Sequence, residues 1–233
     1  MRICGVEGVS VIDYPGRVAS VLFLGGCNFR CPFCHNPELV LHPELQPNHD
    51  LADILAQIQR RKSLVDGAVV TGGEPLIHEE ALLALLSRLR DAGLLVKLDT
   101  NGYEVETLRK VLSTGLVNFV AMDVKTSLGK YEAAAGRRLD AENIRDAIAA
   151  IVHAGVDREF RTTCVPGLVE ADDVQSIASL LGPGEDYVLQ QFRATSPMID
   201  HAHATFKPHS ADTLRSFAET VHPLVRSVTL RGE

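Results

Sequence analysis

Three cysteines stand within eight residues of one another, Cys27, Cys31 and Cys34, in the spacing Cys-x3-Cys-x2-Cys. Thiolates are soft ligands that bind iron–sulfur clusters, zinc or copper, and this spacing lets one loop wrap a single metal centre. Structural zinc takes four protein ligands. A four-iron cluster held by three thiolates keeps one iron without a protein ligand, open to a substrate. The motif therefore predicts a metal centre with an open position.

The remaining cysteines and one histidine leave a second interpretation open. Cys4 and Cys164 lie in apolar surroundings and are expected to behave as small buried hydrophobic side chains. His35 follows Cys34 directly and is the alternative fourth ligand of a zinc site, although neighbouring residues are an awkward pair around one tetrahedral ion. A structural zinc module or an electron-transfer module is thus the non-enzymatic alternative.

Short apolar runs alternate with amphipathic stretches along the chain, which predicts βαβ units and a parallel sheet. The fold class is α/β, a single domain over residues 1–233 that forms a partial (β/α)6 barrel. This domain is expected to have three parts: an N-terminal antiparallel piece (1–17), a βα core (18–192) and a C-terminal loop with a helix and strand (193–233). Strands are expected at 18–24, 68–71, 94–98, 116–122, 159–165, 187–191 and 227–230, and helices at 50–61, 79–92, 104–112, 142–153, 174–181 and 211–221.

Polar residues follow or end successive predicted strands. They are Cys27, Gly73-Glu74, Asp99-Thr100-Asn101, Asp123 with Lys125, Arg161 and Gln190-Gln191. Ligand sites of parallel sheets lie at the carboxyl ends of the strands. These side chains are therefore expected to share one site with the cysteine loop.

With these motifs the chain resembles the radical S-adenosylmethionine (SAM) superfamily. Four further stretches, Gly72-Gly73-Glu74-Pro75, Asp99-Thr100-Asn101-Gly102, Met122-Asp123-Val124-Lys125 and Cys34-His35-Asn36-Pro37, are similar to motifs of its glycyl-radical-enzyme activating branch, as is the stretch Ser10 to Gly16. Within that branch the nearest likeness is to activators of anaerobic ribonucleoside-triphosphate reductase, in a longer form. The resemblance covers nearly the whole chain.

The resemblance implies a [4Fe–4S] cluster on Cys27, Cys31 and Cys34, and SAM as the second cofactor. It places Phe33 and Asn36 beside the adenine, and Gly72, Gly73 and Glu74 at the methionine amino group. Lys125 and Arg161 are placed at the SAM carboxylate, and Thr100 elsewhere in the SAM site. Asp99 and Asp123 are placed around a monovalent cation. Simpler roles stay open: a strand-to-helix turn for the glycines, helix capping for Asp99 or Thr100, salt bridges for Lys125 and Arg161, and core packing for Phe33.

The implied reaction is reductive cleavage of SAM, followed by removal of a hydrogen atom from a glycine of a partner enzyme. The implied partner is anaerobic ribonucleotide reductase, whose glycine loop would dock near Asp13, Tyr14 and Gly16. The chain lacks a cysteine-rich ferredoxin-like insert, so an external electron donor such as flavodoxin or ferredoxin is expected. A radical SAM enzyme with a small-molecule substrate, similar to 7-carboxy-7-deazaguanine synthases, is the enzymatic alternative.

Composition excludes several other classes. The 233 residues carry 23 Lys and Arg against 30 Asp and Glu, a net charge of −7, which argues against nucleic-acid binding and against docking on anionic lipid. The longest apolar runs are too short for a membrane span, and no secretory signal precedes the motif, so a cytoplasmic location is expected. His201, His203 and His209, in a long polar loop at 193–209, are expected to be solvated rather than to bind zinc.

Overall fold

Eight strands form one sheet that runs through the whole chain in the computed structural model, which describes residues 1–232. The strands are β1 (Ile3–Ser10), β2 (Ala19–Leu24), β3 (Gly67–Gly72), β4 (Leu95–Thr100), β5 (Phe119–Asp123), β6 (Asp157–Cys164), β7 (Asp186–Gln191) and β8 (Ser227–Arg231). They follow one another across the sheet in sequence order. β2 to β8 are parallel, and β1 is antiparallel to β2.

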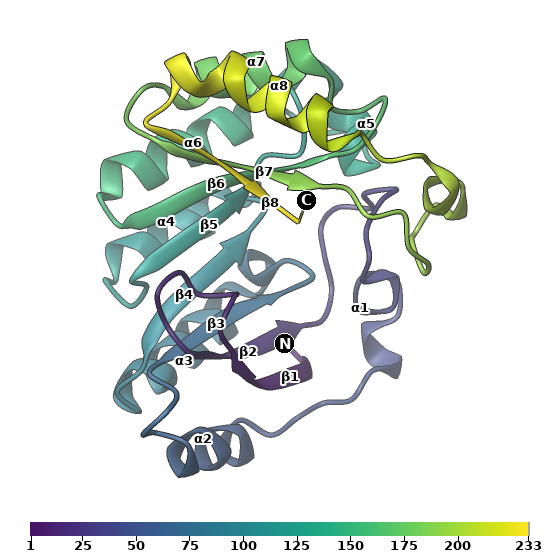
Figure 1. Ribbon diagram of the computed structural model, residues 1–233. Coiled ribbons are helices and arrows are strands. Elements are labelled where there is room, and N and C mark those ends of the chain that lie inside the picture. The colour runs from purple at the N-terminus through teal and green to yellow at the C-terminus, as the bar shows by residue number, and fades with distance from the viewer. Residues whose placement is uncertain (233) are drawn as a thin grey trace.

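Helices connect the parallel strands and lie on the outside of the curved sheet (Figure 1). Every parallel connection leads to the next strand in one direction, and connections of uniform hand place all crossover helices on one face. The described helices are α1 (Pro37–Leu41), α2 (Leu51–Arg60), α3 (Glu79–Asp91), α4 (Val105–Ser113), α5 (Tyr131–Ala135), α6 (Glu142–Ala154), α7 (Ala171–Leu181) and α8 (Ala211–Val221). The sheet ends at β1 and β8, which do not pair in the described chain, so the barrel is partial.

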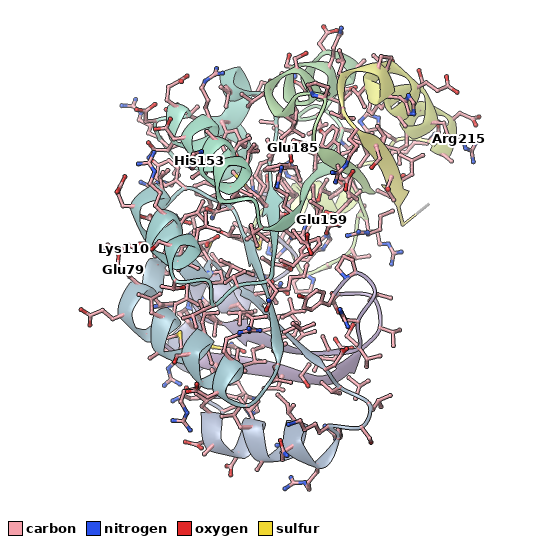
Figure 2. The ribbon with its side chains drawn as sticks, turned by 90° about the vertical axis from the view of Figure 1, so that its left-hand side faces the viewer. Glu79, Lys110, His153, Glu159, Glu185 and Arg215 are labelled. Atoms are coloured by element: carbon pink, nitrogen blue, oxygen red, sulfur yellow. The ribbon has the colours of Figure 1, made fainter. Side chains whose placement is uncertain are left out.

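The main core lies between the outer face of the sheet and the helices. In α3, for example, Leu82, Leu85, Leu86 and Leu89 recur at helical spacing and are all buried. A neighbouring ion pair between Glu79 and Lys110 joins α3 to α4 at the surface, as Figure 2 shows.

A small second cluster fills the inside of the barrel where its strands begin. Tyr14 packs there against the ring of Phe119, with ring centroids 5.9 Å apart, beside Val21 and Val69. Tyr14 also crowds Gly67, the first residue of β3. The turn between β1 and β2 thus closes the end of the barrel opposite the cysteine loop, which follows Leu24 at the end of β2.

The predicted α/β fold with a partial parallel barrel is confirmed, and the sheet is wider than predicted. The residues before 18 contribute the full-length strand β1, antiparallel as expected. At the other edge the expected helix at 211–221 and strand at 227–230 form α8 and β8, so that seven parallel strands replace the six of the predicted barrel. The loop at 193–209 contains a short 3-10 helix (His201–Thr205).

Candidate active site

The three cysteines of the motif line one cavity of about 250 Å³ at the carboxyl ends of the strands. Cys31 is buried and the other two are half-buried. The turn is held by local bonds: the Phe29 amide donates to Cys27 Sγ at 3.3 Å, and the Cys34 amide donates to the Cys31 carbonyl at 3.0 Å. Burial raises the pKa of the Cys27 thiol to about 12 and that of Cys31 to about 11. A bound cation must therefore supply the charge that converts them to thiolates.

The donor set fits an iron–sulfur cluster better than a single ion. Within residues 1–232 no three His, Cys, Asp or Glu side chains converge as the ligands of one metal ion would. Cys4 and Cys164 are buried and do not line the cavity, as expected. His35 lies at its rim, where its Nδ1 is 3.4 Å from Thr195 Oγ1. The cavity thus offers the three thiols of the motif, and within residues 1–232 no fourth cysteine lines it.

Gly72 and Gly73 are required by the backbone beside them. A Cβ on Gly73 would lie 1.8 Å from the Gly26 carbonyl oxygen, and one on Gly72 would lie 2.2 Å from the Leu24 amide. The Gly73 amide donates to Leu24 O at 2.8 Å, and the Glu74 amide donates to Gly26 O at 2.8 Å. The two glycines therefore bring the end of β3 against the start of the cysteine loop, in addition to lining the cavity.

Glu74 ties two strand ends together. Its side chain is 1% exposed and accepts three hydrogen bonds, from the Leu76 amide (3.0 Å), Thr100 Oγ1 (2.7 Å) and the Asn101 amide (2.7 Å). Burial raises the pKa of Glu74 to about 7, against the opposing effect of these bonds. The predicted contact with the methionine amino group would use the acceptor capacity that remains on this carboxylate.

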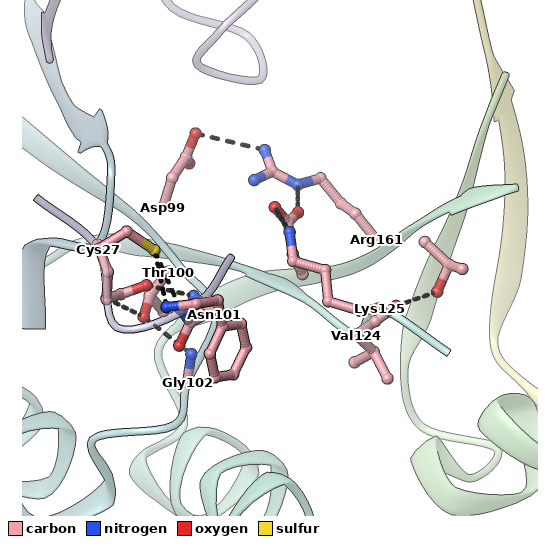
Figure 3. Close-up of polar contacts among 12 residues, drawn as sticks. Cys27, Asp99, Thr100, Asn101, Gly102, Val124, Lys125 and Arg161 are labelled. Atoms are coloured by element: carbon pink, nitrogen blue, oxygen red, sulfur yellow. Dashed lines mark hydrogen bonds and ion pairs between the residues drawn. The ribbon is translucent and has the colours of Figure 1, made fainter. Parts of the chain in front are cut away.

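Asn101, which the sequence placed at the site without a role, connects Glu74 with the cysteine loop. Its Nδ2 donates to Asn28 Oδ1 at 2.8 Å and lies 4.0 Å from Cys27 Sγ, as Figure 3 shows for Asn101 and Cys27. Asn28 in turn donates to Glu104 Oε1 at 3.0 Å. Polar side chains beside a metal ligand orient it and tune the metal.

Arg161 lies between two of the predicted site carboxylates. Its Nε donates to Asp123 Oδ1 at 2.8 Å and its Nη1 lies 3.4 Å from Asp99 Oδ2 (Figure 3). Lys125 Nζ binds the other oxygen of Asp123 at 3.0 Å, and Lys97 pairs with Asp99. The salt-bridge alternative is thus present, and a monovalent cation between the two aspartates would have to share them with the guanidinium.

Opposite charges fix the protonation states of this group. Burial alone would raise the pKa of Asp123, but the adjacent Arg161 and Lys125 cations hold it well below its usual range. Burial would likewise lower the pKa values of Lys125 and Arg161, and Asp123 raises both above their ordinary values instead. Asp123 is therefore ionised, and Lys125 and Arg161 are charged, at neutral pH.

The charge network extends into the barrel beyond the predicted residues. Glu159, labelled in Figure 2, accepts from Arg231 Nη2 at 3.1 Å, and Arg161 Nη1 lies 3.9 Å from the same carboxylate. Lys97 is 1% exposed. Alternation along the strands is the signal that could have found them: Lys97-x-Asp99 and Glu159-x-Arg161 each put two charges on one face.

The remaining predicted residues divide between the cavity and other places. Phe33 and Asn36 line the cavity, together with Thr71 and Thr163, which were not predicted. His203 contacts Asp200, and His209 Nε2 lies 3.0 Å from the Val169 carbonyl oxygen, so the loop histidines do not form a ligand set in the described chain. Tyr14, near which the partner loop was expected, lies at the opposite end of the barrel.

Comparisons with known proteins agree with this geometry. Residues 21–181 match the family described as the radical SAM superfamily. A Methanocaldococcus jannaschii protein named as a glycyl-radical enzyme activating enzyme is 33% identical over 194 residues, 82% of this chain and 79% of the relative. The pyruvate formate-lyase-activating enzyme of Clostridium pasteurianum is 26% identical, over 77% of this chain and 76% of the relative.

A solved structure supports the fold. Streptococcus suis SuiB bound to S-adenosylmethionine superposes with a TM-score of 0.66 at 12% identity, over 91% of this chain. This chain spans about half of SuiB, 52% of its length. Because the family match covers more than half of the chain, and because its three cysteines share one cavity, the protein belongs to the radical SAM superfamily of enzymes, which use a [4Fe–4S] cluster and SAM.

Proposed function

We propose that this protein activates a glycyl-radical enzyme, and that the partner is anaerobic ribonucleotide reductase. The names of relatives that align over more than three quarters of both chains support the activating role. The observation that carries the chemistry is the cavity itself, which is lined by three cysteines and, within the described chain, by no fourth. An iron without a protein ligand is what SAM chelation requires.

When bound, the cluster and SAM supply a 5′-deoxyadenosyl radical that removes a hydrogen atom from the glycine Cα. The chain's own residues would bind SAM and orient it. Lys125 and Arg161 carry the positive charge that would receive the SAM carboxylate through charge-assisted hydrogen bonds. Phe33, on the cysteine loop, and Asn36 line the cavity and would contact the adenine. The buried Glu74 holds the ends of β3 and β4 in register around them.

The open side of the barrel suits a polypeptide substrate. Within residues 1–232 the edges β1 and β8 do not pair, which leaves one side of the barrel open. A partner's glycine loop would approach along this side.

Anaerobic reconstitution with candidate partners tests the proposal. The holoenzyme, SAM and a reductant are mixed with anaerobic ribonucleotide reductase, and in parallel with pyruvate formate-lyase, and spin resonance is recorded. We expect a glycyl-radical doublet that grows with 5′-deoxyadenosine, in the first mixture and not with Cys31→Ala. A doublet only with pyruvate formate-lyase would change the partner. SAM cleavage without a doublet in either mixture would favour the small-molecule alternative.

The proposed function also includes a cellular location and an electron donor. Among the described residues no helix is both long and apolar enough to cross a membrane. We place the reaction in the cytoplasm, with an external flavodoxin or ferredoxin as the source of electrons.

A further inference from the structure

We propose that Arg30, Arg137 and Arg138, here called the arginine face, form the docking surface for an acidic one-electron donor protein. This inference rests on the proposed function, because the cluster must be reduced from outside the chain. One electron leaves the reduced flavin or iron–sulfur centre of the donor and enters the cluster of this enzyme, with no atom or proton transferred.

The arginine face is exposed and carries uncompensated charge. All three side chains are exposed, and within residues 1–232 none of them lies within ion-pair distance of a carboxylate. Other cations are paired: Arg158 with Glu185 at 2.6 Å, and Lys110 with Glu79 at 2.6 Å. Arg30 and Arg137 both bind the backbone of the cysteine loop and Arg138 follows Arg137 in the chain, so three cations without an ion-pair partner among residues 1–232 gather at this loop and would attract an acidic partner.

Two of these arginines lie directly on the backbone of the cysteine loop. Arg30 Nη1 donates to the carbonyl oxygens of Cys27 and Phe29, at 2.7 Å each. Arg137 Nη1 donates to the Asn28 carbonyl oxygen at 2.9 Å. The Arg30 amide also donates to Ala135 O at 2.8 Å, which joins the end of α5 to the loop. A protein bound to this patch would therefore lie against the loop that carries the cluster ligands.

A short packed route leads from the patch to the cavity. The Arg137 guanidinium lies 5.7 Å from the centroid of the Tyr103 ring. Tyr103 packs on Phe29 with ring centroids 5.5 Å apart, and Phe29 lines the cavity. On this route two aromatic side chains, Tyr103 and Phe29, lie between the arginine face and the cavity.

The test compares two charge reversals of equal size. Arg138 is suited because, among residues 1–232, it takes part in hydrogen bonding through its carbonyl, which accepts from Arg137 Nε at 3.2 Å, and not through its guanidinium, so Arg138→Glu leaves the loop contacts intact. Arg60 is the matched control: it is exposed, forms no ion pair among residues 1–232, and ends α2 near the start of β3, at the far end of the barrel. Stopped-flow absorbance follows reduction of the reconstituted holoenzyme, without any glycyl-radical enzyme present.

We expect reduced flavodoxin to reduce the Arg138→Glu holoenzyme about tenfold more slowly than wild type at low ionic strength, with a weaker salt dependence. Arg60→Glu should stay within about twofold of wild type. Photoreduced deazaflavin, a small reductant, should reduce all three proteins equally. Equal losses in both variants, or no loss in Arg138→Glu, would overturn the docking surface. Failure of the radical assay with this charge effect intact would overturn the activating role alone, and a protein with no cluster reducible by deazaflavin would overturn both.

Discussion

Replacing Arg161 with methionine tests whether the charges inside the barrel stabilise the fold as well as the site. The side chain is 12% exposed and bridges Asp99 and Asp123. Removing one partner of a buried ion pair costs about 3–5 kcal/mol, because a charge is left uncompensated. Here Lys97 still faces Asp99 and Lys125 still faces Asp123. We therefore expect Arg161→Met to lower the free energy of unfolding by about 3 kcal/mol, the low end of that range.

The loss should depend on pH in a defined direction. In the wild type the folded-state pKa of Asp123 lies below its unfolded value, so its contribution is present above that value and is lost only in strong acid. The wild-type contribution is therefore constant between about pH 5 and pH 8. In Arg161→Met burial remains and the strongest opposing charge is gone, so the pKa of Asp123 rises. The folded variant then takes up a proton on Asp123 at a higher pH than the wild type does, so its stability deficit should shrink as the pH falls and be smaller at pH 5 than at pH 8.

Urea unfolding of the cluster-free proteins at pH 5 and pH 8 measures both effects. Arg145→Met is the control, because it removes the same charge from an exposed pair with Glu142, whose loss should cost less than about 1 kcal/mol. If Arg161→Met is no less stable than Arg145→Met, or its deficit grows toward acid pH, the reasoning is refuted.

Three further outcomes follow from the cysteine loop and its supports. Cys31→Ala should abolish the visible absorbance of the reconstituted cluster, whereas Cys164→Ala should keep its iron because Cys164 is buried outside the cavity. Retained iron and absorbance in Cys31→Ala would show that Cys31 does not bind the cluster. Gly73→Ala should reduce iron content and the melting temperature together, because its Cβ would meet Gly26 O at 1.8 Å; an unchanged iron content would show that the loop does not need this approach. Asn101→Ala should lower the reduction potential of the cluster by some tens of millivolts in a redox titration, as expected when a donor near a ligand sulfur is lost, and an unchanged potential would argue against that role.

The sequence predicted the place of the site because the site follows strand ends. Buried strands are short and β-branched, and parallel strands bring their carboxyl ends to one edge. Cys27, Asp99 and Asp123 therefore meet at the cavity although they are distant in the chain. The family motifs added the roles of these residues, which the structure leaves as predictions.

Contacts between residues distant in the chain determine the features that the sequence did not reveal. Motif similarity assigned Gly73 to the ligand, while the structure adds a second reason, its approach to Gly26. Tyr14 belongs to a turn motif, yet its burial against Phe119 depends on the curvature of the whole sheet. Arg231 sits on a short, amphipathic final strand, and its partner Glu159 lies 72 residues away. No local pattern encodes such a pairing.

The charges inside the barrel bear on what the site can bind. The ion-paired network holds three carboxylates (Asp99, Asp123 and Glu159) and four cations (Lys97, Lys125, Arg161 and Arg231), and Glu74 lines the same cavity. The pKa values of Lys125 and Arg161 are raised, so both stay protonated. A metal cation between Asp99 and Asp123 would have to displace the Arg161 guanidinium, whereas a ligand carboxylate would meet cations that are already charged and held in place.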